Sequence, residues 1–300
     1  MIINLPELPV PEIQNWLQYA IAPRPIALVS SVDRDGNPNL APFSFFNLVS
    51  SNPPIVIFSP ARRVRDNTTK HSLENLYHVP EVVINIVTYE MVQQASLASC
   101  EFPKGVDEFV KAGFGKEKAS QVRPFMVKES PVKFECRVVE KKPLGKSGGA
   151  GNLIIAEVLC MHINEEILDD TGLMIDQTKL NHVARLGGDW YALINETALF
   201  KVPKPNRNVG IGMDSLPAWI YQYRSLTRND LAQLANVDTL PKGNANFDDK
   251  HSAISAEILM NGWKKEKVES YVKELLLDNN LSLAWQVLLN DQQNNKADIF

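Results

Sequence analysis

The chain has 300 residues, of which 44% are hydrophobic, and its 31 basic and 35 acidic side chains leave a formal net charge of −4. This length allows one large domain or one domain with an appendage, and the acidic balance argues against nucleic acid or an anionic membrane as a partner. No signal peptide and no run of about 18 apolar residues is found, so we expect a cytoplasmic protein without a membrane span.

The first two hundred residues alternate short apolar runs with polar turns. Strands are predicted over 26–32, 39–46, 55–59, 82–87, 132–139, 153–163 and 190–194. Helices are predicted over 13–19, 70–78, 90–99, 107–112 and 175–183. Asp35-Gly36 is a hairpin signal between the first two strands. Because strands and helices do not alternate regularly, we expect a mainly antiparallel β-barrel or sandwich that carries helices.

The composition changes near residue 195, and strand signals end there. Thr227 and Asp230 have the spacing of a helix start, and apolar residues recur at helical spacing over 268–276 and 281–289. Residues 292–300 are expected to fray. We therefore assign 1–195 to a β domain and 196–300 to an α-helical C-terminal extension.

Several kinds of site are excluded or assigned a structural role. Cys100, Cys136 and Cys160 are far apart, so we expect three small core residues, with no disulfide and no metal site. The glycine-rich run 148–151 lacks nucleotide-loop spacing and is interpreted as a mobile hairpin tip. His162 lies in a strand without a nearby acid and is interpreted as structural, and His251 as a surface residue. No carboxylate pair is spaced for acid–base chemistry.

Two neighbouring stretches suggest a ligand site. The ring segment, residues 39–47, combines phenylalanines with small and polar residues and offers a flat apolar surface with turning backbone N–H groups. The basic segment, residues 59–72, contains charged and hydroxyl donors that suit a phosphate, with a helix predicted to start near Lys70. The alternative for the basic segment is a solvated loop paired with Asp66 and Glu74. A planar ring with a phosphate tail describes flavin mononucleotide (FMN).

The sequence resembles the FMN-binding split-barrel family of flavin reductase-like proteins, which includes flavoredoxin-like members. The resemblance covers about residues 15–195 and rests on these segments in order: Pro23–Ser30, Asn39–Asn47, Pro53–Val56, Glu108-Phe109 with Ala112-Gly113, Ser130–Val132 with Glu135-Cys136, Ile155–Val158, and Arg185–Gly188 with Tyr191. It implies a six-stranded Greek-key split barrel, usually a homodimer, that binds FMN non-covalently near the subunit interface.

Carried over by position, the resemblance places the flavin ring on the ring segment, largely through backbone: Asn39, Ala41, Pro42, Phe43, Ser44 and Asn47. It places the phosphate on the basic segment: Ser59, Arg62, Arg63, Lys70, His71 and Ser72. Phe45 and Phe46 are either barrel core or ligand contacts. The family commonly has an acidic residue before a threonine where this chain has His71-Ser72, so the role of His71 stays open.

The resemblance implies transfer of hydride or electrons through flavin N5, from NAD(P)H as substrate to flavin or another acceptor. Short flavin reductases often carry a histidine just before the strand at 155–158, where this chain has Gly151-Asn152. His182 and Arg185 are the remaining candidates for contacting a substrate, and the alternative is that they form a dimer-interface or helix-end pair. A second reading is a flavoredoxin-like electron carrier with a protein redox partner. A third is a flavin-binding module whose helical extension docks a partner.

Overall fold

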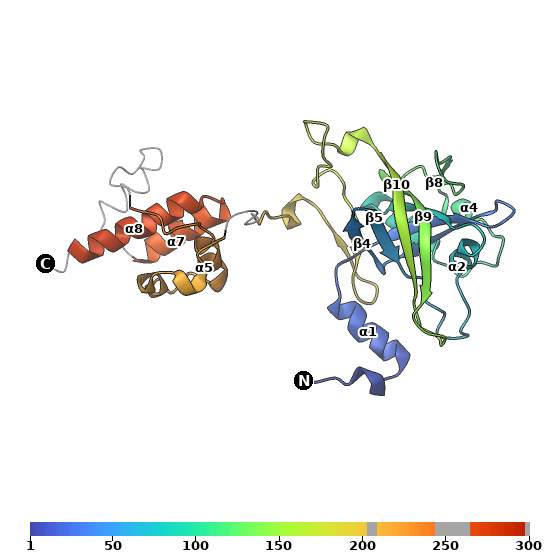
Figure 1. Cartoon of the computed structure of the whole chain (residues 1–300), viewed down its shortest axis with the longest axis horizontal. Coiled ribbons are helices and arrows are strands. Elements are labelled where there is room, and N and C mark those ends of the chain that lie inside the picture. The colour runs from blue at the N-terminus through green and yellow to red at the C-terminus, as the bar shows by residue number, and fades with distance from the viewer. Residues whose placement is uncertain (203–208, 244–264, 298–300) are drawn as a thin grey trace. The chain divides into compact units, whose positions relative to one another are not determined.

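The computed structural model describes residues 1–202, 209–243 and 265–297 of the chain. The chain divides into two compact units, Met1–Leu199 and Phe200–Phe300 (Figure 1). Among the described residues, no helix combines the length and the apolar character that crossing a membrane requires. His251, interpreted from the sequence as a surface residue, lies outside the described residues.

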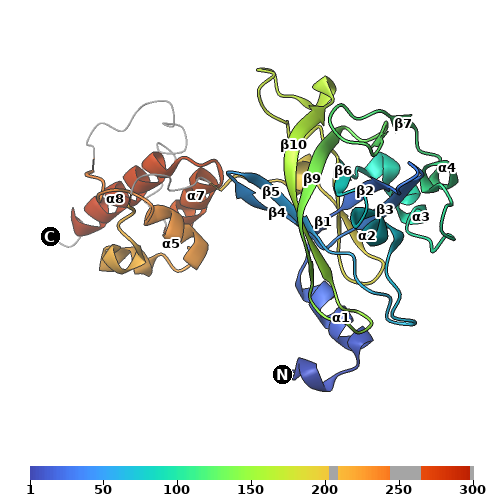
Figure 2. The same cartoon turned by 45° about the vertical axis from the view of Figure 1, so that its right-hand side comes forward.

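The first unit is built on an antiparallel seven-stranded sheet (Figure 2). Its strands, in spatial order, are β3 (Pro38–Phe43), β2 (Ala27–Val32), β6 (Glu81–Ile86), β9 (Val132–Pro143), β10 (Asn152–Ile163), β5 (Pro54–Phe58) and β4 (Phe46–Ser51). Every paired neighbour runs antiparallel. The predicted mainly antiparallel fold is confirmed.

Strand β2 shows why the apolar run at 26–29 becomes part of a central strand. All six of its residues are buried. Ala27 and Val29 contribute to the core that the sheet encloses, whereas Leu28 packs into a second core beneath the helices that follow β6. Since successive side chains point to opposite faces, a strand covered on both sides favours consecutive apolar residues, as at Ala27–Val29, over an alternating pattern.

The predicted strand 39–46 is in fact two strands, β3 and β4, which occupy opposite edges of the sheet. Only Ser44 and Phe45 connect them, so the edges come within about 11 Å of each other at this point. Phe43 of β3 and Phe58 of β5 meet across the enclosed core, with ring centres 5.6 Å apart. The sheet therefore curls into a barrel that is open along one side, with seven strands instead of the six expected.

Helices and short strands surround this barrel. The helices are α1 (Val10–Ala20), α2 (His71–Leu76), α3 (Val92–Leu97) and α4 (Glu108–Ala112), with short 3₁₀ turns η1 (Leu5–Glu7), η2 (Tyr89–Met91), η3 (Glu165–Ile167) and η4 (Glu196–Ala198). A three-stranded sheet contains β1 (Arg24–Pro25), β11 (Val183–Arg185) and β12 (Tyr191–Leu193), and a two-stranded one contains β7 (Lys116–Glu117) and β8 (Met126–Val127).

The helix predicted over 175–183 is wrong, because this segment consists of turns that lead into β11. The Asp176 carboxylate accepts hydrogen bonds from the Thr178 backbone N–H at 2.9 Å and from its hydroxyl at 2.7 Å. Asn181 then adopts a positive φ of 48°. Such local side-chain bonds compete with helical hydrogen bonding, and the left-handed residue ends any helical path.

The second unit is helical, as predicted. Its elements are η5 (Met213–Ser215), η6 (Ala218–Gln222), α5 (Arg228–Leu234), α7 (Lys265–Leu277) and α8 (Leu281–Ala297). Thr227 and Asp230 form the expected reciprocal cap at the start of α5. The apolar stripes of α7 and α8 pack in one core around the buried Trp285.

The predicted fraying of 292–300 is wrong for residues 292–297, which continue α8, and residues 298–300 lie outside the described part. Asp291 explains the longer helix, because its side chain is buried and accepts a hydrogen bond from the Tyr223 hydroxyl at 2.5 Å. This contact ties the last turns of α8 to the rest of the helical unit.

Candidate functional site

The crossing between β3 and β4 presents free backbone donors. Ala41 and Phe43 turn their side chains into the barrel core, so a ligand at this edge meets them through backbone only. On the outward side, the Leu40 N–H donates to Glu108 Oε2 at 3.1 Å, and Pro42 has no N–H. Within the described chain, the N–H groups of Ser44 and Phe45 donate to no other group. The ring segment therefore offers two adjacent donors at the open side of the barrel.

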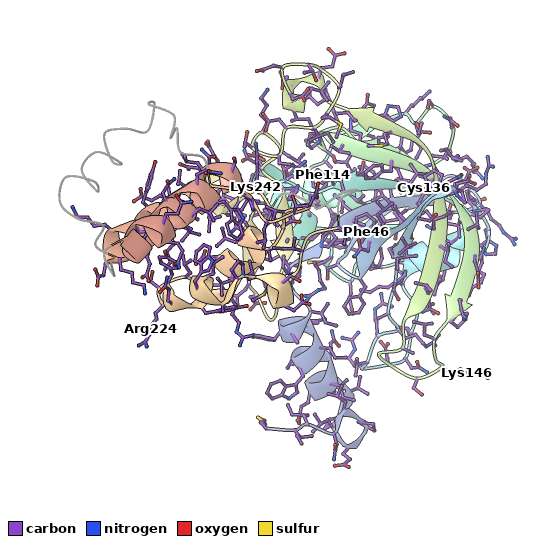
Figure 3. The ribbon with its side chains drawn as sticks, turned by 60° about the vertical axis from the view of Figure 1, so that its left-hand side comes forward. Phe46, Phe114, Cys136, Lys146, Arg224 and Lys242 are labelled. Carbon is purple, nitrogen blue, oxygen red and sulfur yellow. The ribbon has the colours of Figure 1, made fainter. Side chains whose placement is uncertain are left out.

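The phenylalanines of the crossing take different roles. Phe46 packs against the barrel core (Figure 3), whereas Phe45 is 43% exposed. Asn47 is also exposed, and its side-chain oxygen accepts the Leu48 N–H at 2.8 Å. Of the two readings left open by the sequence, core therefore applies to Phe46, and Phe45 remains available to a ligand.

A buried hydrogen bond joins the ring segment to the basic segment. Asn39 Nδ2 donates to Ser72 Oγ at 2.8 Å, and both side chains are buried. Asn75, one turn further along α2, donates to Ser31 Oγ of β2 at 3.1 Å. Helix α2 is thus fixed to β3 and β2. These bonds cross 33 and 44 residues of sequence, so no local pattern reveals them.

The arginines of the basic segment are held by the segment itself and by one distant acid. Arg62 Nε donates to Asn67 Oδ1 at 2.6 Å. Arg63 contacts Glu101 at 3.0 Å and donates to the Thr69 carbonyl oxygen at 2.6 Å. Arg63 therefore pairs with Glu101, and not with Asp66 or Glu74, the acids named in the alternative interpretation of this segment. Arg65 pairs with Asp66 at 3.3 Å and with Glu101 at 2.8 Å, and Glu74 accepts hydrogen bonds from Thr69 and Lys104.

Lys70 and His71 leave an excess of positive charge beside Arg63. Within the described residues, the Lys70 ammonium makes no hydrogen bond and no ion pair. Burial lowers the pKa of Lys70, the charge of Arg63 lowers it further, and the charge of Glu101 opposes the shift. Burial also lowers the pKa of His71; Glu74 opposes the shift, and Arg63 and Lys70 reinforce it. Neighbouring cationic groups that lower each other's pKa are groups whose charged form a bound anion would stabilise.

Ser59 connects the crossing to the hairpin between β9 and β10. Its N–H donates to the Phe45 carbonyl oxygen at 2.9 Å. Gly151 lies opposite, and a Cβ there would be 2.6 Å from Ser59 Oγ. Only glycine therefore leaves room for the hydroxyl in this position.

The hairpin tip, predicted to be mobile, is bonded to the basic segment. Arg62 N–H donates to the Ala150 carbonyl oxygen at 2.9 Å, and Gly149 N–H donates to that of Arg62 at 3.0 Å. A Cβ at Gly148 would be 2.9 Å from the Val64 carbonyl oxygen. Lys146, at the tip (Figure 3), accepts a hydrogen bond from Asn67 through its carbonyl oxygen. The glycines thus allow close packing of two backbones.

The two candidates for contacting a substrate differ in how they are held. Arg185 of β11 lies 4.5 Å from the centre of the Tyr191 ring and donates to the Gly188 carbonyl oxygen. Its guanidinium is thus occupied within its own hairpin. His182 is half-buried, and burial lowers its pKa.

A surface pocket of about 490 Å³ lies beside α2 at the turn between β2 and β3. It is lined by Asp33, Arg34, Asp35, Glu74, Asn75, Tyr77, His78 and Lys104. It contains none of the predicted ring or phosphate residues, and we assign it no role.

Two sequence interpretations outside the candidate site are wrong. His162 does have an acid partner, since its Nε2 lies 2.6 Å from Oε1 of the buried Glu135. Of the three cysteines only Cys136 is buried, and burial raises the pKa of its thiol to about 12. Cys100 is exposed and Cys160 is half-buried.

Comparison with known proteins shows which family the chain belongs to. A model described as "Flavin reductase like domain" matches residues 19–184, more than half of the chain. The chain belongs to the flavin reductase-like family. An uncharacterised protein of Aquifex aeolicus is 36% identical over 171 residues, which cover 57% of this chain and 84% of that protein.

Two solved structures support the fold of this family member. Nitrilotriacetate monooxygenase component B from Bacillus cereus is 28% identical, with a TM-score of 0.62, and the match covers 67% of this chain and 98% of that one. A Shewanella frigidimarina protein, described as a flavin reductase with a split barrel domain, is 24% identical with a TM-score of 0.58, over 68% and 99% of the two chains. The predicted split barrel and its helical C-terminal part are confirmed.

Proposed function

We propose that this family member is a flavin reductase-type oxidoreductase that binds FMN non-covalently at the β3–β4 crossing and the basic segment. One observation supports this most: the two halves form a single structure. The Phe45 carbonyl oxygen accepts from Ser59 N–H at 2.9 Å, and Asn39 donates to Ser72 at 2.8 Å. Free amides for the ring thus lie on the same framework as two cations for the phosphate: Arg63, and Lys70, which makes no ion pair within the described residues.

The residues fit FMN in their donor chemistry. The Ser44 and Phe45 N–H groups would donate to acceptors of the flavin ring, and Phe45 offers an exposed apolar side chain beside them. Lys70 and Arg63 would pair with the phosphate, with His71 and the Ser59 hydroxyl nearby. Bound FMN would supply hydride transfer, and the chain would position it and set its electrostatics.

The proposed reductant is NADH or NADPH, with His182 as the candidate contact, and the proposed location is the cytoplasm. Steady-state oxidation of each nicotinamide by the FMN-loaded protein tests this, with free FMN as acceptor. We expect turnover that depends on bound FMN. Bound FMN without turnover of either nicotinamide would refute the reductase proposal.

An FMN-binding electron carrier with a protein redox partner is the alternative, and one observation favours it. Short flavin reductases often have a histidine just before the segment that corresponds to residues 155–158 of β10. Asn152 here is buried and donates to the Pro60 carbonyl oxygen at 2.9 Å. The side chain at this position is therefore committed to the fold and does not face a substrate. A carrier would bind FMN and exchange electrons with a protein but would not oxidise a nicotinamide.

We also propose that the protein is a homodimer. None of the residues of α1 is buried, although Trp16 and Tyr19 are large and aromatic. On the edge strand β4, Leu48 is 61% and Val49 54% exposed. Exposed apolar side chains on an edge strand favour association with another chain. Sedimentation equilibrium of the full chain should give twice the monomer mass, and a monomer at all concentrations would refute the dimer.

A further inference from the structure

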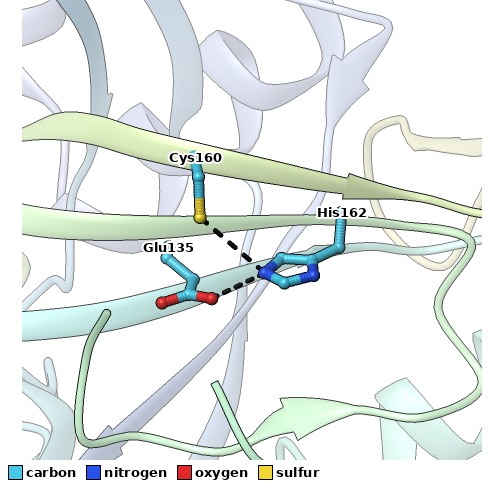
Figure 4. Close-up of side chains that lie close together, drawn as sticks. All are labelled: Glu135, Cys160 and His162. Atoms are coloured by element: carbon cyan, nitrogen blue, oxygen red, sulfur yellow. Dashed lines mark hydrogen bonds and ion pairs between the residues drawn. The ribbon is translucent and has the colours of Figure 1, made fainter. Parts of the chain in front are cut away.

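Three metal-ligating side chains meet on one face of strands β9 and β10 (Figure 4). Cys160 of β10 is paired with Glu135 of β9, and His162 follows Cys160 by two residues. Opposed residues of an antiparallel pair share a face, as do residues two apart on a strand. The other face of β9 carries Cys136 and Val138 into the barrel core. The cluster therefore lies outside the barrel.

The distances between the donor atoms suit a zinc ion. His162 Nε2 lies 3.7 Å from Cys160 Sγ and 2.6 Å from Glu135 Oε1, and the three donor atoms all lie within 4.8 Å of one another. In a tetrahedral zinc site with ordinary bond lengths, nitrogen and sulfur ligands are about 3.6 Å apart, and nitrogen and oxygen ligands about 3.4 Å. The nitrogen–sulfur distance already fits, and the nitrogen–oxygen distance has to lengthen by about 0.8 Å.

The arrangement differs from a catalytic triad. In a triad, the nucleophile bonds one ring nitrogen and the orienting acid bonds the other. Here a single nitrogen, Nε2, faces both Cys160 and Glu135 (Figure 4). In the described part of the chain, Nδ1 bonds no protein group. Three donors that converge on one point are the arrangement that a metal ion requires.

The surrounding loop holds the carboxylate in position. Glu135 Oε2 accepts the backbone N–H groups of Gln121 at 2.6 Å and Val122 at 3.1 Å. Oε1 accepts the N–H and the hydroxyl of Ser120, both at 2.8 Å. Such outer contacts orient a ligand before the metal binds. The His162 side chain is 33% exposed, which leaves a route from solvent.

We propose that Glu135, Cys160 and His162 bind one Zn²⁺ ion, with a fourth position open to solvent. Carboxylate, thiolate and imidazole are the ligands that zinc takes in proteins. Binding releases the Cys160 thiol proton to solvent, and the neutral His162 ring binds through Nε2 with its proton on Nδ1. Through Glu135, the ion would link strand β10 to the loop at 120–122.

The test is a zinc titration of the tag-free, metal-stripped full-length protein against a chromophoric competitor. We expect one equivalent of Zn²⁺ per chain. Since loss of an outer contact alone weakens metal binding by about 10–100-fold, Cys160→Ser and His162→Gln should each weaken it by at least about 100-fold. Cys100→Ser, which removes an exposed thiol elsewhere, should bind as the unchanged protein does. These variants leave the Glu135 contacts to the loop in place, so folding is preserved.

Two further readouts identify the thiolate. Co²⁺ in place of zinc should give a sulfur-to-cobalt charge-transfer band that Cys160→Ser lacks and Cys100→Ser keeps. Zinc should slow alkylation of Cys160 by iodoacetamide at least about tenfold and leave that of Cys100 unchanged. Absence of zinc binding in the unchanged protein, or equal binding by Cys160→Ser, would overturn the proposal. Neither readout depends on FMN.

Discussion

Two charged regions of the barrel unit, the basic segment and the Glu135 cluster, are balanced in opposite ways. The Glu135 carboxylate is buried, yet it accepts hydrogen bonds from four donor groups of the loop residues Ser120, Gln121 and Val122 and also contacts His162. Lys70 is half-buried beside Arg63 and makes no hydrogen bond or ion pair within the described residues. A charge bonded by neighbouring groups stabilises the fold, even where it is also proposed as a metal ligand, whereas a cation left without a partner indicates a place for an anionic ligand.

The largest expected effect concerns the uncompensated region. Replacing Arg63 and Lys70 together by alanine should weaken FMN binding by more than about 100-fold, since each charge-assisted hydrogen bond contributes about 1.5–3 kcal/mol. Riboflavin, which lacks the phosphate, should lose less than about threefold. Fluorescence titration measures both. Lys104→Ala, which removes an exposed cation bound to Glu74, is the matched control. An equal loss for both flavins would remove these residues from a phosphate site.

In the Glu135 cluster, where the charge is compensated, replacing the carboxylate is expected to lower the stability of the fold. Burial acts to raise the pKa of Glu135, but hydrogen bonds from Ser120 and Gln121 outweigh it and lower that pKa to about 2. Glu135→Gln, which cannot accept all of these bonds as an anion does, should therefore reduce the free energy of unfolding near neutral pH by about 2–3 kcal/mol.

The pH dependence gives this prediction its sign. A carboxyl whose pKa is lowered by folding stabilises the protein above its unfolded value, here 4.5, and loses that contribution as the pH falls toward about 2. The stability difference between the unchanged protein and Glu135→Gln should shrink over this interval in denaturant titrations. A difference that stays constant from neutral pH down to the lowest value would contradict the assignment.

Gly151 tests whether the hairpin shapes the site. A Cβ at this position would be 2.6 Å from Ser59 Oγ, so Gly151→Ala should displace the hydroxyl and weaken FMN binding by roughly tenfold. Gly145→Ala in the same hairpin is the control, because its Cβ would meet only the Ala150 methyl group, at 3.0 Å. If both variants bind FMN as tightly as the unchanged protein, Ser59 has no role in the site.

The smallest effect separates fold from site within α2. Ser72→Ala and Ser31→Ala each remove one buried hydrogen bond from this helix, so each should cost about 1 kcal/mol of stability. Only Ser72→Ala should also weaken FMN binding, by about threefold, because Ser72 lies at the proposed phosphate site. Thermal unfolding and FMN titration measure the two effects. Equal FMN affinity in both variants would assign Ser72 a purely structural role.

Local patterns predicted most of the barrel and part of the helical unit. The apolar run of β2, the hairpin at Asp35-Gly36 and the cap at Thr227 each depend on neighbouring residues, and each appears in the structure. The break between β3 and β4 was missed because it depends on a change of sheet edge, which no short window contains. The turns before β11 were missed because Asp176 bonds its own backbone neighbours.

The site could be predicted only in part, for the same reason. The ring and basic segments lie close in sequence, and their composition indicates them. Glu101 binds Arg63 across 38 residues, and Glu135 binds His162 across 27. The second pair also depends on a register shift between β9 and β10. Such partners follow from tertiary structure, and a single sequence does not indicate them.

The measurement that tests the central claim most directly is an equilibrium titration of the flavin-free, full-length protein with FMN and with riboflavin. Quenching of the flavin fluorescence reports binding. We predict one FMN per chain and at least about 100-fold weaker riboflavin binding, because only FMN carries the phosphate that Lys70 and Arg63 can pair with. Protein that quenches neither flavin, or that binds both with equal affinity, would contradict the proposed site.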